Sequence, residues 1–165
     1  MGGPRRDAAA LPVRRGAVDL ALLSMVYHLL ASPAATAAEL HRVLGPGGAV
    51  LVRTPTREIL DRIGFLPFFP AARAIDEARM PARASLEAVF AGAGFGGGLH
   101  ATVEHEFAPT PAEAYAKVSR RPFSSLRLMP DNAFAEGLVR YEAFCRNAPP
   151  EPLVEPLDLF VFHRA

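Results

Sequence analysis

Hydrophobic positions divide the chain into short apolar runs and amphipathic stretches. Residues 18–23 and 49–52 are almost uniformly apolar, a pattern typical of strands that are buried on both faces of a parallel sheet. Between them, Ser32 as N-cap and Gly45-Pro46 as a stop signal predict a helix over 33–44. The order strand, helix, strand predicts a βαβ unit with a right-handed crossover.

The predicted helix over 33–44 is amphipathic. An apolar stripe on one side predicts its buried face, and Glu39 and Arg42 are expected to point outward. The stripe consists of Ala37, Leu40, Val43 and Leu44.

Later segments predict further helices and strands. The helices are expected at 71–78, 85–93, 111–120 and after Asp131, which is the expected N-cap, and the strands are expected at 100–107 and 157–162. Alternation in the first of these strands places Val103, His105 and Phe107 on its buried face. Thr102, Glu104 and Glu106 are then expected on its solvent face.

The apolar run at 18–23 predicts more than a strand. A strand inside a parallel sheet needs a neighbour on each edge and cover on both faces, otherwise backbone amides and apolar side chains are left in water. Only 17 mostly polar or loop-like residues precede this run. We therefore expect either another chain to supply the neighbour or the sequence to be the C-terminal part of a larger α/β domain.

Composition and charge argue against several classes of function. The 165 residues fit one domain, and 18 basic against 17 acidic residues argue against a nucleic-acid partner. The single cysteine, Cys145, excludes an intramolecular disulfide and fits the reducing cytoplasm. The apolar run 17–31 contains Asp19 and is too short for a membrane span, so neither export nor a membrane location is expected.

Three segments in order carry a resemblance to a known family. They are Asp7–Pro12, Val18–His28 and Leu40–Gly48, the last ending in Gly45-Pro46-Gly47-Gly48. Together they resemble a class I S-adenosylmethionine-dependent methyltransferase, closest to the small-molecule branch of the ubiquinone/menaquinone-biosynthesis type. The resemblance is close over residues 7–56 and looser beyond.

The resemblance implies a fold and a cofactor site. The fold would be α/β, the later strands of a Rossmann-like sheet with flanking helices, the last strand antiparallel and paired between its neighbours. The cofactor would be S-adenosyl-L-methionine, with Asp7 and Ala8 at the adenine and Ser24 and Met25 beside it. The acceptor would be a small molecule.

The sequence departs from the family pattern in two places. Leu29 replaces the second histidine of a paired-histidine motif that begins at His28. The family's glycine-rich loop and the acidic residue that holds the ribose hydroxyls are not found. Residues 1–165 are therefore expected to form a single incomplete methyltransferase-like domain that lacks most of the cofactor side.

Methyl transfer from a sulfonium needs alignment, a dry site and at times a base for the acceptor's proton. His28 is the candidate for that base, and the alternative is packing against the following helix. Residues 57–82 form a candidate acceptor-side lid in which Phe65, Phe68 and Phe69 shape the substrate pocket; the alternative is a helix-turn packed on its own core. His105 is expected to be a satisfied core histidine, and no metal site is expected.

Two functions follow from these expectations. The first is methyl transfer to a small-molecule acceptor, with the activity of the chain as given limited by the missing cofactor half. The second is a non-catalytic half-domain that completes its sheet with a partner chain or by self-association. A flavodoxin-like nucleotide-binding domain is disfavoured because the sequence has no phosphate-cradling loop.

Overall fold

The computed structural model describes residues 8–164, so the predicted adenine contact Asp7 lies outside the described residues. In chain order the elements are β1 (Val18–Ser24), η1 (Tyr27–Leu29), α1 (Pro33–Val43), β2 (Leu44–Thr54), η2 (Arg57–Arg62), η3 (Leu66–Phe68), α2 (Pro70–Arg79), α3 (Arg83–Gly92), β3 (Phe95–Ala108), α4 (Pro111–Ser119), α5 (Ser124–Leu128), α6 (Asp131–Asn147) and β4 (Leu153–Arg164), where η denotes a 3₁₀ helix. The predicted helices and strands are all present, and the strands extend beyond their predicted ends.

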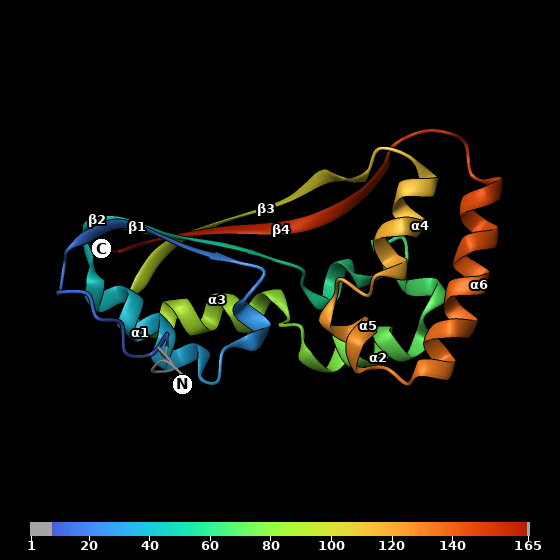
Figure 1. The fold of residues 1–165 in the computed structure, drawn as a ribbon. Coiled ribbons are helices and arrows are strands. Elements are labelled where there is room, and N and C mark those ends of the chain that lie inside the picture. The colour runs from blue at the N-terminus through green and yellow to red at the C-terminus, as the bar shows by residue number, and fades with distance from the viewer. Residues whose placement is uncertain (1–7, 165) are drawn as a thin grey trace. The chain divides into compact units, whose positions relative to one another are not determined.

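The described chain forms two compact units (Figure 1). Unit 1 comprises the described residues up to Thr54 together with Pro81–Thr102 and the chain from Asp158 onward. Unit 2 comprises Pro55–Met80 and Val103–Leu157. Strands β3 and β4 therefore contribute residues to both units.

The sheet has the strand order β1-β2-β4-β3. β1 pairs with β2 in parallel, with Leu22 opposite Leu51, and β2 pairs with β4 antiparallel, with Leu51 opposite Val161. The last strand is thus antiparallel and lies between two others, which confirms the fold that the resemblance implied.

Helices α1 and α3 cover one face of the sheet in unit 1. Ser32 caps α1 as predicted, because its Oγ accepts a hydrogen bond from the backbone N–H of Ala35 at 3.3 Å. The predicted apolar stripe is buried together with Leu86 and Phe90 of α3 and side chains from all four strands. The rings of Phe90 and Phe162 stack at 4.3 Å between centroids, so α3 is packed directly on β4.

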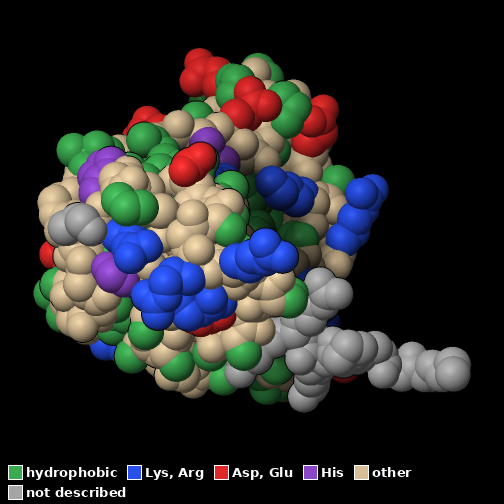
Figure 2. All heavy atoms as spheres, turned by 90° about the vertical axis from the view of Figure 1, so that its left-hand side faces the viewer, with side chains coloured by type: hydrophobic (Ala, Val, Ile, Leu, Met, Phe, Trp, Pro, Cys, Tyr) green, Lys and Arg blue, Asp and Glu red, His purple; other side chains and the backbone are tan. Residues whose placement is uncertain are grey.

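β1 does not occupy the interior position expected from its apolar sequence. It lies at the end of the strand order, and Leu20 and Leu22 are 62% and 59% exposed. Leu23 points to the helix-covered face and is buried. Figure 2 shows hydrophobic side chains among basic side chains on the face that lies to the left in Figure 1. The almost uniformly apolar sequence of residues 18–23 therefore predicted a strand correctly, but it did not predict that the strand lies at the edge of the sheet with one face exposed.

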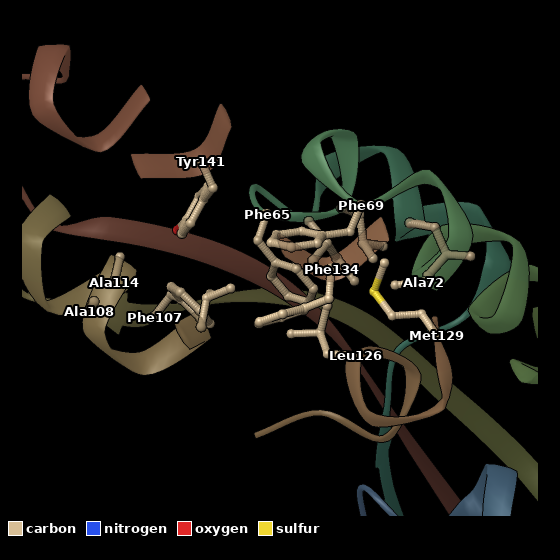
Figure 3. Close-up of a cluster of buried hydrophobic side chains, with 14 of the residues drawn as sticks. Phe65, Phe69, Ala72, Phe107, Ala108, Ala114, Leu126, Met129, Phe134 and Tyr141 are labelled. Atoms are coloured by element: carbon tan, nitrogen blue, oxygen red, sulfur yellow. The ribbon is translucent and has the colours of Figure 1, made fainter. Parts of the chain in front are cut away.

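Unit 2 has its own hydrophobic core, shown in Figure 3. Phe69 is fully buried and stacks on Phe134 of α6 at 5.5 Å between centroids. Gly137 of α6 makes this packing possible: a Cβ there would lie 2.5 Å from Cδ1 of Phe69 and 2.6 Å from the carbonyl oxygen of Phe68. Only a residue without a side chain allows η3 and the start of α2 to lie this close to α6.

Two local predictions were wrong. Val103 was expected to be buried but is 38% exposed, while Thr102 is half-buried, because the inward-facing positions of β3 change parity between Thr102 and His105. Asp131 was expected to cap α6. Its carboxylate instead accepts a hydrogen bond from Arg121 Nη1 at 2.6 Å, and the N-cap position belongs to Pro130.

Candidate functional site

The carboxyl ends of β1 and β2 lie side by side in unit 1. Ser24 is opposite Arg53 in the parallel ladder, and Arg53 Nη1 donates a hydrogen bond to Ser24 Oγ at 3.4 Å. The next residue, Met25, has a φ of 57°, in the left-handed region that non-glycine residues seldom adopt, and its N–H donates to the carbonyl of Arg53 at 2.8 Å. Open α/β sheets bind their ligands at this end of the strands, so Ser24 and Met25 lie where a ligand site is expected.

His28, the predicted base, follows directly in η1. Its side chain is half-buried, and its neighbour Tyr27 is buried, which raises the pKa of the Tyr27 hydroxyl. Ser24, the last residue of β1, is thus followed within four residues by Met25 and His28.

Glu39 and Arg42 hold the loop that contains Ala8. Both were expected to point into solvent, but Glu39 accepts a hydrogen bond from the N–H of Leu11 at 2.7 Å, and Arg42 Nη2 donates to the carbonyl of Val13 at 2.8 Å. Arg42 also bonds Glu39 directly, which lowers the pKa of that carboxyl to about 2. The outward prediction was wrong because the loop before β1 folds back onto this side of α1.

Sequence reasoning missed a polar network in unit 1. Asp158 of β4 is fully buried and lies opposite Thr54 at the carboxyl end of β2. Its Oδ2 accepts from Arg83 Nε at 3.2 Å, and its Oδ1 accepts from Thr102 Oγ1 at 2.6 Å and lies 2.9 Å from His100 Nε2. The network ties the first residue of α3 to β3 and β4.

One signal in the sequence could have found this network. Asp158 has the same strand parity as the buried residues Phe160 and Phe162, so alternation alone places its carboxylate on the buried face. Since a buried carboxylate requires partners, a cation and further donors were to be expected near it. Which residues they are could not be read locally, because Arg83 is 75 residues away.

The predicted pocket residues Phe65, Phe68 and Phe69 all lie in unit 2. Phe65 and Phe69 are buried in the cluster that Figure 3 shows. The Phe65 ring stacks on Phe123 at 4.8 Å between centroids. Phe65 and Phe69 therefore pack on the core of the unit, as in the alternative interpretation. Phe68 is half-buried and borders a hollow on the surface.

Unit 2 also buries an acidic side chain. Glu155 of β4 is 8% exposed; it accepts a hydrogen bond from the backbone of Gly64, whereas its Oε1 has no partner among the described residues. Burial raises the pKa of this carboxyl to about 7, although the Gly64 bond and the charge of Lys117 act in the opposite direction.

His105 is less well satisfied than expected. It is half-buried, as a core histidine would be, but its Nδ1 is buried and makes no hydrogen bond within residues 8–164. The expectation that it is a satisfied core histidine was wrong for this nitrogen.

The first part of unit 1 matches a known family. Residues 5–52 match the family model described as a methyltransferase domain. This segment contains Ala8, Ser24, Met25 and His28. The fold is that of a class I methyltransferase. The methyltransferase fold that the resemblance implied is thereby confirmed. No curated protein sequence matches the chain.

Solved structures agree with the methyltransferase fold. A protein from Anabaena variabilis, described as a methyltransferase from an antibiotic biosynthesis pathway, superimposes with a TM-score of 0.76 at 14% identity, over 94% of this chain and 70% of that one. A possible histamine N-methyltransferase from Thermotoga maritima has a TM-score of 0.56 at 13% identity, over 96% and 61%. A phosphoethanolamine N-methyltransferase from Haemonchus contortus, solved with S-adenosylhomocysteine, has a TM-score of 0.50 at 12% identity, over 96% and 36%.

The lengths of these methyltransferases differ from that of the chain. They cover nearly all of it, whereas the chain spans 70%, 61% and 36% of their own lengths. Among residues 8–164, none of the helices combines the length and the apolarity that crossing a bilayer requires.

Proposed function

We propose that this chain takes part in S-adenosylmethionine-dependent methyl transfer to a small-molecule acceptor in the cytoplasm. One observation carries the proposal. The segment that matches the methyltransferase domain contains Ser24, which ends β1, and Met25 and His28, which follow it, at the end of the strand where α/β sheets bind ligands. When bound, the cofactor would supply an electrophilic methyl group.

The residues present fit the adenine side of such a cofactor. Ala8 belongs to a loop fixed by Glu39 and Arg42, and the half-buried Met25 offers apolar contact next to the hydroxyl of Ser24. A site built on fixed segments needs little reordering on binding. His28 would accept the proton that an N–H or O–H acceptor loses, provided that its imidazole is neutral.

The affinity for the cofactor is expected to be weak. The sequence holds neither the glycine-rich loop nor the acidic residue that this family uses for the remainder of the cofactor. Each missing contact removes binding free energy, so we expect the chain alone to bind with a dissociation constant above the micromolar range.

Calorimetry with S-adenosylmethionine tests this proposal. Ser24→Ala and Met25→Ala should each weaken binding several-fold, whereas Val139→Ala, an exposed position of unit 2, should leave it unchanged. Binding that is equal in all four proteins, or absent at millimolar cofactor, would contradict the proposed site. Micromolar binding by the unmodified chain would show that the missing contacts are not needed.

The edge position of β1 favours a second candidate function. Leu20 and Leu22 are exposed on a strand that carries only one charged residue, Asp19, whereas edge strands are normally protected by charges or by being short. We propose as the alternative a non-catalytic half-domain whose β1 pairs with a partner chain or with a second copy. Light scattering after size exclusion separates the two functions, because a stable monomer at high concentration would argue against self-association. Binding of S-adenosylmethionine would argue for the first function.

A further inference from the structure

A hollow on the surface of unit 2 lies outside the segment that carries the methyltransferase match. Its volume is about 560 Å³, within the range of small-molecule sites. It is lined by Phe68, Arg140, Ala143, Phe144, Asn147, Ala148 and Pro149. Four of these residues follow one another at helical spacing along α6 and form one wall, and Phe68 of η3 comes from a different part of the chain.

Two aromatic rings meet in this hollow. Phe68 and Phe144 lie 5.1 Å apart between centroids at an interplanar angle of 41°, so that they open a wedge. Phe144 is 43% exposed, which leaves much of its ring free for a further contact. Buried Tyr141 braces both rings, at 5.2 Å from Phe68 and 6.1 Å from Phe144. Rings held in place in this way can stack on a planar ligand at small cost in conformational entropy.

Among residues 8–164, Arg140 is the one charged residue that lines the hollow. Arg140 Nη2 donates a hydrogen bond to the carbonyl oxygen of Phe68 at 3.0 Å, which directs the guanidinium toward the aromatic wedge. The remaining N–H groups of Arg140 make no hydrogen bond to residues 8–164, and no acidic residue contributes to the lining. A guanidinium with free donors suits a carboxylate, which it can bind through two parallel hydrogen bonds.

We propose that this hollow binds a small planar aromatic anion, with its ring against Phe68 and Phe144 and its carboxylate on Arg140. The site goes beyond methyl transfer, because it uses residues of unit 2 alone and requires no cofactor. Gly137 supports it indirectly, since the close approach that this residue permits brings Phe68 next to α6.

Titration calorimetry of the whole chain with 2-naphthoate tests whether the hollow prefers a negatively charged ligand. The neutral analogue 2-naphthylmethanol and the cation 2-naphthylmethylammonium serve as comparisons of similar shape. We expect naphthoate to bind at least fivefold more tightly than the alcohol and the cation to bind most weakly. Equal affinities for all three would overturn the assignment of an anion.

Variants on α6 test the position. Arg140→Ala should weaken naphthoate binding at least fivefold, whereas Arg146→Ala should leave it unchanged, because Arg146 lies on the same helix, pairs with Glu142 and does not line the hollow. Phe144→Leu keeps an apolar side chain and should reduce binding without unfolding the unit, as near-ultraviolet circular dichroism would show. Full affinity in Arg140→Ala or in Phe144→Leu would refute the site, whatever the outcome with S-adenosylmethionine.

Discussion

Glu155 makes the stability of unit 2 depend on pH. Burial raises the pKa of its carboxyl from 4.5 to about 7, so the folded unit keeps its proton where the unfolded chain has released it. Between these two values the folded state binds more protons, and stability therefore falls as pH rises. A difference of about 2.5 pKa units corresponds to about 3 kcal/mol, which is fully lost above pH 7.

Replacing the carboxyl by an amide removes this dependence. Glu155→Gln should exceed the stability of the unmodified protein by less than about 1 kcal/mol at pH 5 and by up to about 3 kcal/mol at pH 8. The assay is urea unfolding at pH 5, 6, 7 and 8, followed by near-ultraviolet circular dichroism of the aromatic core. Glu151→Gln, an exposed neighbour, is the matched control and should retain the loss of stability toward pH 8. If the difference between Glu155→Gln and the unmodified protein were constant over this range, the reasoning would be refuted.

Three further substitutions test the packing. Asp158→Asn removes the buried charge that faces Arg83 and should cost about 3 kcal/mol in chemical unfolding, the low end for a broken buried pair because Arg83 is one third exposed. Gly137→Ala should cost about 1–2 kcal/mol in thermal unfolding despite alanine's better helix propensity, since its Cβ would collide with Phe69; a gain in melting temperature would contradict this. Ser32→Ala removes the cap of α1 and should cost about 1 kcal/mol, whereas an unchanged urea midpoint would show that the cap contributes nothing.

Local signals in the sequence were sufficient to predict the helices and strands. The boundaries of α1 followed from Ser32 and Gly45-Pro46, because capping and helix termination depend on neighbouring residues. The central position of β4 followed from the resemblance to methyltransferases and not from periodicity. The same pattern that predicted β1 could not show its place at the edge, since the number of strands beside it is a property of the whole sheet.

Long-range partners explain most of what could not be predicted. The helical pattern predicted that Glu39 and Arg42 face solvent. It could not show their partners, because the loop that they bind precedes them by about 30 residues. Asp158 likewise obtains its partners from α3 and β3, 56 to 75 residues away. For the candidate site, sequence reasoning proposed the segment at the end of β1, and the structure added the contacts of Arg53 with Ser24 and Met25.

The left-handed backbone of Met25 has a consequence for protein engineering. Glycine relieves such a conformation at no steric cost, so a screen for heat resistance would be expected to select Met25→Gly. The same exchange deletes the apolar side chain that is proposed to touch the cofactor. A library selected for thermal stability alone would thus lose this proposed contact. Selection at position 25 therefore has to include a test of ligand binding.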